Sequence, residues 1–538
     1  MNLQEKGKKL HLRMDELFYY LFIGILMGAK GVGLTEGQKL FTCCLLLAGI
    51  CWVIKMCLTG YSLKEWILTV LLMGLSFLIW RRTGEKAAAA AVMVIMGMKG
   101  IPLKRLMKIC LAVWGITFVF SLSRGLLGIA DGVVVVHEKL GLGPIVRYSL
   151  GYTHPNVLHV TYFILVMLFI YVFRPTGHRL WCTAGLLFVG NLYIFLYSIS
   201  YTGMIIVTAY LLMSIYFDIR KKLSFLEKGL AVLFVLFCII FPIAGPLLLT
   251  GKVFNFFNSL LSTRFELVYM IFHDNQVSLF GTNVLTRDGA RMSLDSSFAY
   301  MLMYYGLIAF VLMVGLYLYS LYYCLSRNMR QEAAILLGTA LAGVTEQFLF
   351  NLSFKNIALF ILGYALFAGV LKTENETGKE KELGVLLLQS RKGVAVPVPC
   401  ILYTIKNAMS RVWKEKKKWI MVGGCACSIL LTAGWLFLGE KAEYVLVEKW
   451  ATDYRGEEEF VMTEELLSDQ TPHIRVGNIS EGCEGYRFAG NAIKMERVRC
   501  IASTLVWGFL DGFVIVSAVL LWKAGIRYQP RSQTKENG

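Results

Sequence analysis

The chain has 538 residues, of which 57% are hydrophobic and only 17% are charged, and its mean hydropathy is +0.60. These values exclude an ordinary soluble globular protein and are typical of a membrane protein. The formal net charge of +18 does not indicate nucleic-acid binding, because the basic residues occur in short clusters between hydrophobic runs. Cytoplasmic loops of membrane proteins have this pattern.

Apolar windows long enough to cross a bilayer, about 20 residues each, recur along the chain. In residues 1–371 they predict spans at 17–34, 39–58, 63–80, 87–98, 109–128, 158–173, 180–198, 202–217, 230–250, 298–324, 331–350 and 354–371. Two more spans are predicted at 419–438 and 500–522. The sequence therefore predicts an all-α polytopic membrane protein, with a bundle of about twelve spans and a C-terminal two-span hairpin.

The distribution of Lys and Arg predicts which loops face the cytoplasm. The basic loops RPTGHR, DIRKKLSFLEK and SRNMR alternate onto one side, together with both termini. By the positive-inside rule this side is the cytoplasm. The segments 129–157 and 251–297 are then predicted to be extracellular.

A change of composition predicts a boundary after the twelfth span. The segment 372–418 holds 11 Lys or Arg against 5 acids, whereas 439–499 holds 8 against 13. We therefore predict a membrane domain over 1–371, a basic cytoplasmic linker over 372–418, and an appendage over 419–538 whose loop 439–499 is extracellular.

Polar residues gather in five segments that the predicted topology places on the outer side. These are RYSLGYTHPN (147–156), SISYTG (198–203), STRFE (262–266), RDGARMSLDSSF (287–298) and TEQFLFN (345–351). Ionisable groups near a membrane are costly and point to a functional site. We expect these segments to converge at the outer mouth of one bundle.

This arrangement resembles the bacterial O-antigen ligase/polymerase family, the Wzy-like polysaccharide polymerases, and in particular its Gram-positive capsule and exopolysaccharide branch. The resemblance covers roughly residues 15–371. The residues that carry it are Arg147, Ser149, Leu150, Gly151, His154, Pro155, Asn156, Ser200, Thr202, Gly203, Arg264, Asp295 to Phe298, Tyr304 to Leu307, and Glu346.

The sequence also departs from the family pattern. Many relatives carry Arg or Lys at the position of Tyr201 and Asn where this chain has Ser296. The ligase branch typically has His near the span start where Asp295 stands here, so the His-bearing ligase mechanism does not transfer unchanged. The family offers no counterpart for the hairpin 400–538.

The resemblance implies a GT-C-like glycosyltransferase of the bacterial cytoplasmic membrane. Its reaction would polymerise polyprenyl-diphosphate-linked oligosaccharide repeats into capsular polysaccharide or exopolysaccharide at the outer face. A leaving diphosphate needs fixed cations, and arginine binds phosphate oxygens in a bidentate way. The expected substrate-binding residues are Arg147, Asn156, Ser200, Tyr201, Arg264, Arg287 and Arg291.

The acceptor hydroxyl has a pKa far above 7, so a positioned general base would speed its attack. The candidates are Asp295, His154 and Glu346. Asp295 is favoured, because it stands at a span start shortly after two arginines, and His154 is an alternative group for orienting sugar or phosphate. The lipid diphosphate already carries the activation, so we expect neither a metal nor another cofactor.

Each candidate also has a structural interpretation. His154, Pro155 and Asn156 can form an ordinary helix start with a polar cap. Arg264 can be a solvated loop residue, and the segment 200–203 can be a tight turn. Glu346 can pair with Lys355 instead of acting in chemistry.

Two other functions compete with polymerisation. One is a ligase that transfers the glycan to another acceptor, and the other is a non-enzymatic flippase for lipid-linked oligosaccharides. A flippase is expected to place its charges along a path reachable from both sides, often with internal repeats, whereas here the charges are one-sided and no repeat is seen. The expected partners are the lipid-linked oligosaccharide, membrane lipids and proteins that regulate chain length or glycan assembly.

Overall fold

The computed structural model describes residues 9–126, 133–139, 141–261, 263–285, 292, 294–371, 394–397, 400–439, 441–448, 460–461, 472–476, 485–488 and 490–526. It divides into two compact units. The bundle unit comprises residues 13–133 and 148–393, and the appendage unit comprises residues 1–12, 134–147 and 394–538.

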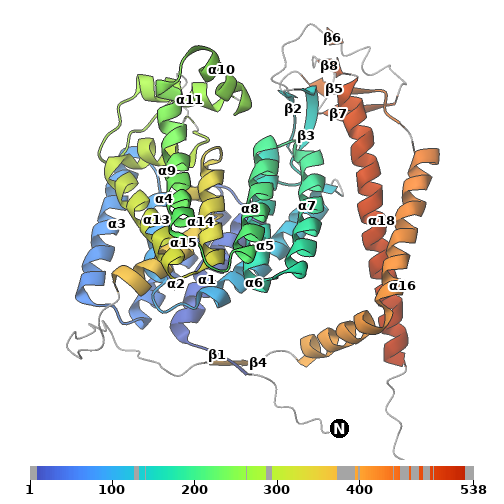
Figure 1. Cartoon of the computed structure of the whole chain (residues 1–538), viewed down its shortest axis with the longest axis horizontal. Helices are drawn as coiled ribbons and strands as arrows, with labels where there is room; N and C mark the ends of the chain where they lie inside the picture. The colour runs from blue at the N-terminus through green and yellow to red at the C-terminus, as the bar shows by residue number, and fades with distance from the viewer. Residues whose placement is uncertain are drawn as a thin grey trace, which may run out of the picture. The chain divides into compact units, whose positions relative to one another are not determined.

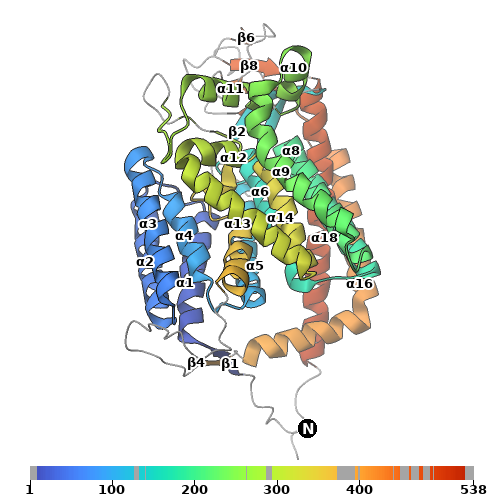
Figure 2. The same cartoon turned by 60° about the vertical axis from the view of Figure 1, so that its left-hand side comes forward.

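The bundle unit is helical. Its α-helices are α1 (Met14–Gly31), α2 (Lys39–Leu58), α3 (Leu63–Thr83), α4 (Ala87–Gly97), α5 (Leu103–Leu126), α6 (Pro155–Phe173), α7 (His178–Ser198), α8 (Tyr201–Ile219), α9 (Phe225–Leu248), α10 (Gly251–Leu260), α11 (Arg264–Asp274), α12 (Ser297–Tyr300), α13 (Gly306–Ser326), α14 (Arg330–Gly343) and α15 (Ala358–Ala365). Shorter helical turns are η1 (Met301–Tyr305), η2 (Gln347–Phe350) and η3 (Leu366–Val370). Helices α2, α3 and α4 lie side by side at one edge of this unit (Figures 1 and 2).

Within the described residues, ten helices are long and apolar enough to cross a membrane. They are α2, α3, α5, α6, α7, α8, α9, the continuous helix Ser297–Ser326, α16 (Cys400–Leu438) and α18 (Asn491–Ile526). The protein is therefore a multi-pass helical membrane protein, as predicted. The predicted span 298–324 and the span 39–58 coincide closely with helices.

Four predicted spans do not form long apolar helices. The segment 17–34 forms α1, whose first turn carries Asp15 and Glu16 and whose last turn carries Lys30. The segments 87–98 and 354–371 form short apolar helices, and 331–350 forms a helix that ends at Gly343. The described residues before position 372 thus contain eight long apolar helices, fewer than the predicted count of about twelve.

Helix α4 nevertheless returns the chain along α3. It has 11 residues, about 16 Å at 1.5 Å per residue, which is roughly half of the hydrocarbon core. It starts after Gly84, the left-handed cap of α3. Beyond its other end, Lys99 Nζ lies 2.5 Å from Glu65 Oε2 in the first turn of α3. Residues 98–100 form a turn at this end of α4, which brings Lys99 back to the start of α3.

A buried charged network fixes the end of the bundle at which α1 begins. Arg13 Nη2 lies 2.5 Å from Asp15 Oδ2, and Arg105 of α5 pairs with Glu16. Lys55 of α2 is buried and its ammonium donates a hydrogen bond of 2.6 Å to the hydroxyl of Tyr61. Buried charges are tolerated when they are paired or hydrogen-bonded in this way, and the pair Glu16–Arg105 ties α1 to α5.

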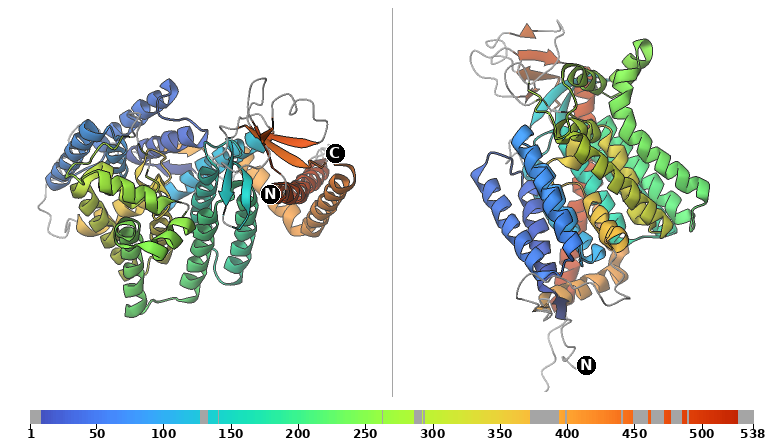
Figure 3. Two further views of the ribbon diagram at one scale, coloured as in Figure 1. Left: turned by 90° about the horizontal axis from the view of Figure 1, so that it is seen from above. Right: turned by 90° about the vertical axis from the view of Figure 1, so that its left-hand side faces the viewer.

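The appendage unit is built on the hairpin of α16 and α18, which lie side by side (Figures 1 and 3). Its strands are β1 (Lys9–Leu12), β2 (Val134–Lys139), β3 (Gly143–Tyr148), β4 (Val394–Pro397), β5 (Tyr444–Glu448), β6 (Phe460–Val461), β7 (His473–Val476) and β8 (Gly485–Phe488). They form the antiparallel pair β1–β4, the pair β2–β3, and a sheet of order β6-β8-β5-β7.

The hairpin β2–β3 joins this unit through α18. Arg499 donates a hydrogen bond of 2.6 Å to the carbonyl of Val146, and Asn491 donates one of 3.0 Å to the carbonyl of Leu142. Residues 134–147 therefore belong with the C-terminal hairpin, although the sequence places them more than two hundred residues before it.

Candidate functional site

A cavity of about 410 Å³ lies in the bundle unit, at the end where α1 finishes and α6 begins. This volume is within the range of small-molecule sites, roughly 300 to 1,000 Å³. The ionisable and amide side chains that line it are Lys30, His154, Asn156, Asp295, Glu346, Gln347, Asn351 and Lys355. Three of the polar segments identified in the sequence thus meet at one cavity.

A fourth polar segment reaches the cavity through Arg264, the first residue of α11. The Nε atom of Arg264 lies 3.2 Å from Asp295 Oδ2, and its Nη2 atom lies 3.7 Å from Glu346 Oε1. Its Nη1 atom donates a hydrogen bond of 3.0 Å to the carbonyl of Leu261. Arg264 is therefore a shared partner of two carboxylates rather than a solvated loop residue.

The two carboxylates differ in exposure. The side chain of Asp295 is 43% exposed, whereas those of Glu346 and Arg264 are 13% and 11% exposed. Asp295 stands one residue before Ser296, which caps α12, and Glu346 follows the end of α14. One acid thus faces the open cavity, and the other is largely withdrawn from solvent.

The fifth segment supports Glu346 from the start of α8. Thr202 donates a hydrogen bond of 3.3 Å to Glu346 Oε1. Ser200 caps the same helix, because its hydroxyl accepts a hydrogen bond from the amide of Gly203 at 3.3 Å. Ser297 also donates to the main-chain carbonyl of Glu346. These contacts fix both the side chain and the backbone of Glu346.

Burial changes the charge state of two of these groups, which lie outside the ten long spans. It raises the pKa of Glu346 to about 7, against the opposing effect of the Arg264 cation. It lowers the pKa of Lys355 to about 7, against the opposing effect of Glu346. Both groups therefore titrate near neutral pH, a property that clusters at functional sites.

His154 and Asn156 lie at the start of α6 and also line the cavity. His154 is the cap of α6, and its Nδ1 atom accepts a hydrogen bond of 3.1 Å from the amide of Asn156. Pro155 takes the first helical position, which suits its fixed φ. The helix-start interpretation is therefore right, yet both side chains also line the cavity.

Lys30 is a cavity residue that sequence reasoning missed. It lies in the last turn of α1, and its Nζ atom stands 4.2 Å from the centre of the Phe41 ring. A Lys at the end of an apolar run ordinarily extends its ammonium group to the membrane–water interface. The only signal in the sequence was the glycine-rich turn that follows it, over residues 31–33.

A buried polar network next to the cavity, at His159, was also missed. His159 of α6 is fully buried, with Nδ1 2.9 Å from the hydroxyl of Ser198 and Nε2 2.7 Å from Oδ1 of Asn191. A Cβ atom added to Gly203 would lie 2.4 Å from the His159 ring. The glycine at position 203 therefore lets α8 approach α6 closely, beside the residues that hold Glu346.

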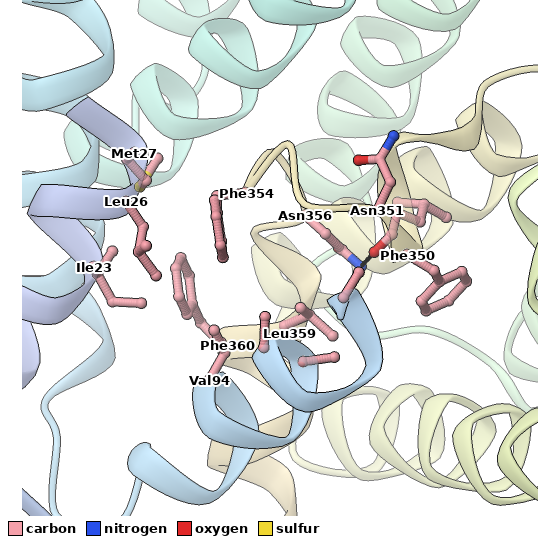
Figure 4. Close-up of a pocket in the computed structure, with 14 residues that line it drawn as sticks. Ile23, Leu26, Met27, Val94, Phe350, Asn351, Phe354, Asn356, Leu359 and Phe360 are labelled. Atoms are coloured by element: carbon pink, nitrogen blue, oxygen red, sulfur yellow. Dashed lines mark hydrogen bonds between the residues drawn. The ribbon is translucent and has the colours of Figure 1, made fainter. Parts of the chain in front are cut away.

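An apolar pocket adjoins the polar cavity at Asn351, which lines both. Figure 4 shows Leu26 of α1 on one side of this pocket and Asn351 on the other. Its volume is about 20 Å³, close to what one water molecule requires. The polar cavity is thus the space that has room for a ligand.

The remaining predicted site residues lie elsewhere. Arg147 is buried in the appendage unit, at β3. Tyr201 is half-buried at the start of α8, where its ring lies 5.7 Å from that of Phe195, and it is not among the described residues that line the cavity. Arg287 and Arg291 lie outside the described residues. Their predicted substrate contacts stay predictions.

Comparison with known proteins gives no matching family model, no matching curated protein and no matching solved structure. The structure itself shows a multi-span helical membrane protein, with a cavity lined by acidic and basic side chains at one end of its bundle.

Proposed function

We propose that the protein is a membrane glycosyltransferase that polymerises polyprenyl-diphosphate-linked oligosaccharides at the outer face of a bacterial cytoplasmic membrane. The observation that carries the proposal is the cavity in which Glu346 and Asp295, joined by Arg264, face the cations Lys30 and Lys355. Bond formation to an acceptor hydroxyl calls for a base, and departure of a diphosphate calls for cations. The cavity holds both kinds of group.

In the proposed reaction, the acceptor hydroxyl oxygen forms a bond to the anomeric carbon of the donor sugar. The bond from that carbon to the diphosphate oxygen breaks, and the electron pair leaves with the lipid diphosphate. The proton of the hydroxyl passes to the general base. No oxidant or reductant is needed, because the diphosphate ester supplies the activation.

Glu346 suits the role of base better than Asp295. The pKa of Glu346 is raised to about 7 by burial, and general bases work best when the pKa lies near the working pH. Asp295 is more exposed and lies 3.2 Å from the guanidinium of Arg264. We assign Asp295 the task of holding Arg264, which in turn orients Glu346.

Lys30, Lys355 and His154 are the groups placed to meet an anionic headgroup. All three line the cavity. Arg264 is not among the described lining residues and already contacts two carboxylates and a carbonyl, so its role is to position rather than to clamp phosphate. Lysine binds phosphate as a point charge, without the fork geometry of arginine.

The test uses the purified full chain in liposomes with a lipid-linked oligosaccharide repeat. We expect longer lipid-linked glycans and an equivalent release of polyprenyl diphosphate. Lys355→Ala and Glu346→Gln should each suppress both products, while Lys252→Ala and Asp274→Asn, at exposed positions outside the cavity lining, should not. The absence of products from the wild-type protein would contradict the proposal.

The same liposomes separate the competing functions. A ligase would transfer the glycan only when another acceptor is added, and would not lengthen the lipid-linked repeat. A flippase would move a fluorescent lipid-linked oligosaccharide across the bilayer without releasing polyprenyl diphosphate. Either result, with no chain lengthening, would replace the proposed polymerase.

A further inference from the structure

Helix α18 carries a single acid at the middle of its apolar run. The run extends from Cys500 to Trp522, and Asp511 is its only ionisable side chain other than the thiol of Cys500. Eleven residues separate Asp511 from either end of the run. At 1.5 Å per residue each half is about 16 Å long, so Asp511 falls close to the midplane of a bilayer with a core of about 30 Å.

The packing of the hairpin leaves Asp511 on an open face. Gly508 and Gly512 lie against α16, since a Cβ atom added to either would come within 2.7 Å of the α16 backbone. Asp511 is exposed, and so are Val514 and Ile515, at 61% and 58%. One face of α18 thus packs on α16, and another presents an acid beside apolar side chains.

Among the described residues, Asp511 makes no hydrogen bond or ion pair. The costs of an acid at membrane depth are avoided when it pairs with another polar group or faces water. The described long spans offer no such cation, because their Lys and Arg residues lie toward the ends of the apolar runs or, like Lys55, are buried in other contacts. We therefore look for the partner of Asp511 in another protein.

We propose that the exposed face of α18 docks a transmembrane helix of another protein that carries a Lys or Arg at mid-membrane depth. Charge complementarity selects this occupant over a second copy of the chain. A second copy of the hairpin would offer only another Asp511, because α16 has no charged residue between Trp419 and Leu438. Two carboxylates at one apolar interface repel each other unless one takes up a proton.

The test measures energy transfer between the labelled full chain and a labelled membrane-spanning Leu-Ala peptide with one Lys at its midpoint, in phosphatidylcholine liposomes. A peptide with Leu at that midpoint is the reference probe. We expect the Lys peptide to bind roughly tenfold more strongly than the Leu peptide. Asp511→Asn and Asp511→Leu should remove this preference, and Asp511→Glu should keep it.

Leu430→Asn provides the matched control, since Leu430 is an exposed residue near the middle of the apolar part of α16, residues 419–438, and its replacement should leave the preference unchanged. Circular dichroism and liposome recovery confirm that each variant is folded and inserted. Equal binding of both peptides by the wild type, or an unchanged preference in Asp511→Asn, would overturn the proposal. Energy transfer between two labelled copies of the chain would also overturn the proposal if Asp511→Asn abolished it. The occupant of this face would then be a second copy.

Discussion

Arg264 and Glu346 form an ion pair, with Nη2 and Oε1 3.7 Å apart, although one residue begins α11 and the other follows α14. The same guanidinium lies 3.2 Å from Asp295. Arginine keeps its charge over the whole physiological pH range. It therefore holds together two carboxylates that would otherwise repel each other.

Replacing Arg264 by Gln should slow polymerisation roughly 10- to 150-fold, the equivalent of about 1.5 to 3 kcal/mol for the loss of the charged partner of a buried carboxylate. The Arg264 cation lowers the pKa of Glu346, so its removal should move the midpoint of the pH–rate curve to higher pH. Arg264→Lys should restore part of the rate. The exposed Arg179→Gln is the control, and wild-type kinetics in Arg264→Gln would show that the ion pair is incidental.

Replacing Glu346 by Gln should lower the turnover rate by about 10²- to 10⁴-fold, the usual contribution of a general base. A base acts when it is deprotonated. Because the pKa of Glu346 is raised to about 7, the wild-type rate should rise with pH and reach half of its maximum near pH 7. Glu346→Gln should flatten this rise. A greater loss in Asp295→Asn, with the rise intact in Glu346→Gln, would transfer the role to Asp295.

Replacing Lys355 by Met should raise the KM for the lipid-linked donor roughly 10- to 150-fold by removing one charge-assisted contact. The pKa of Lys355 is lowered to about 7, so the free cavity loses this charge as the pH rises through that value. Donor binding by the wild type should weaken in the same pH range. Lys252→Met serves as the control, and an unchanged KM in Lys355→Met would place the diphosphate elsewhere.

Cysteine labelling tests the predicted sidedness of the membrane domain. In a variant without native cysteines, Thr153→Cys and Asn283→Cys should react with an impermeant maleimide in intact cells, while Lys222→Cys should react only after lysis. All three positions are exposed, and the expectation follows from the alternation of basic loops. Labelling of Lys222→Cys alone would invert the topology and move the cavity to the cytoplasmic side.

Gly203→Ala should lower the thermal stability of the bundle, since the added Cβ would meet the His159 ring at 2.4 Å. Overpacking of this kind costs about 1 to 3 kcal/mol. Gly185→Ala is the matched control, because nothing lies within 4 Å of its added Cβ and Ala favours a helix. Thermal unfolding in detergent should separate the two variants, and equal midpoints would mean that α8 moves aside easily.

Hydropathy was enough to predict where most helices lie, because a helix that crosses lipid needs a long apolar run. It overestimated α14, whose residues continue as apolar turns after Gly343. Apolar residues next to a buried site are packed against protein and not against lipid. Protein interiors and lipid favour the same apolar side chains, so hydropathy does not distinguish the two. The helices α10 and α11, which bring Arg264 to Asp295, were not predicted, since they lie in the segment 251–297, which the sequence predicts to be a loop between two spans.

The candidate site was predictable only in part. The one-sided polar segments, together with the family resemblance, identified Asp295, Glu346, His154 and Asn156, which the structure brings to one cavity. The sequence pattern does not distinguish Lys30 from an ordinary lysine at a helix end. It also does not show that β2 and β3 belong to the same unit as the hairpin of α16 and α18. Pairings of distant segments depend on tertiary contacts, which composition does not record.

The cap at the start of α6 restricts what His154 can do. Its Nδ1 atom accepts a hydrogen bond from the amide of Asn156 at 3.1 Å, so that nitrogen is unprotonated and the neutral ring carries its hydrogen on Nε2. In this tautomer the ring offers its Nε2–H to the cavity as a hydrogen-bond donor, while Nδ1 is occupied by the cap. The cap thereby makes His154 a group that orients a ligand oxygen rather than a general base acting through Nδ1.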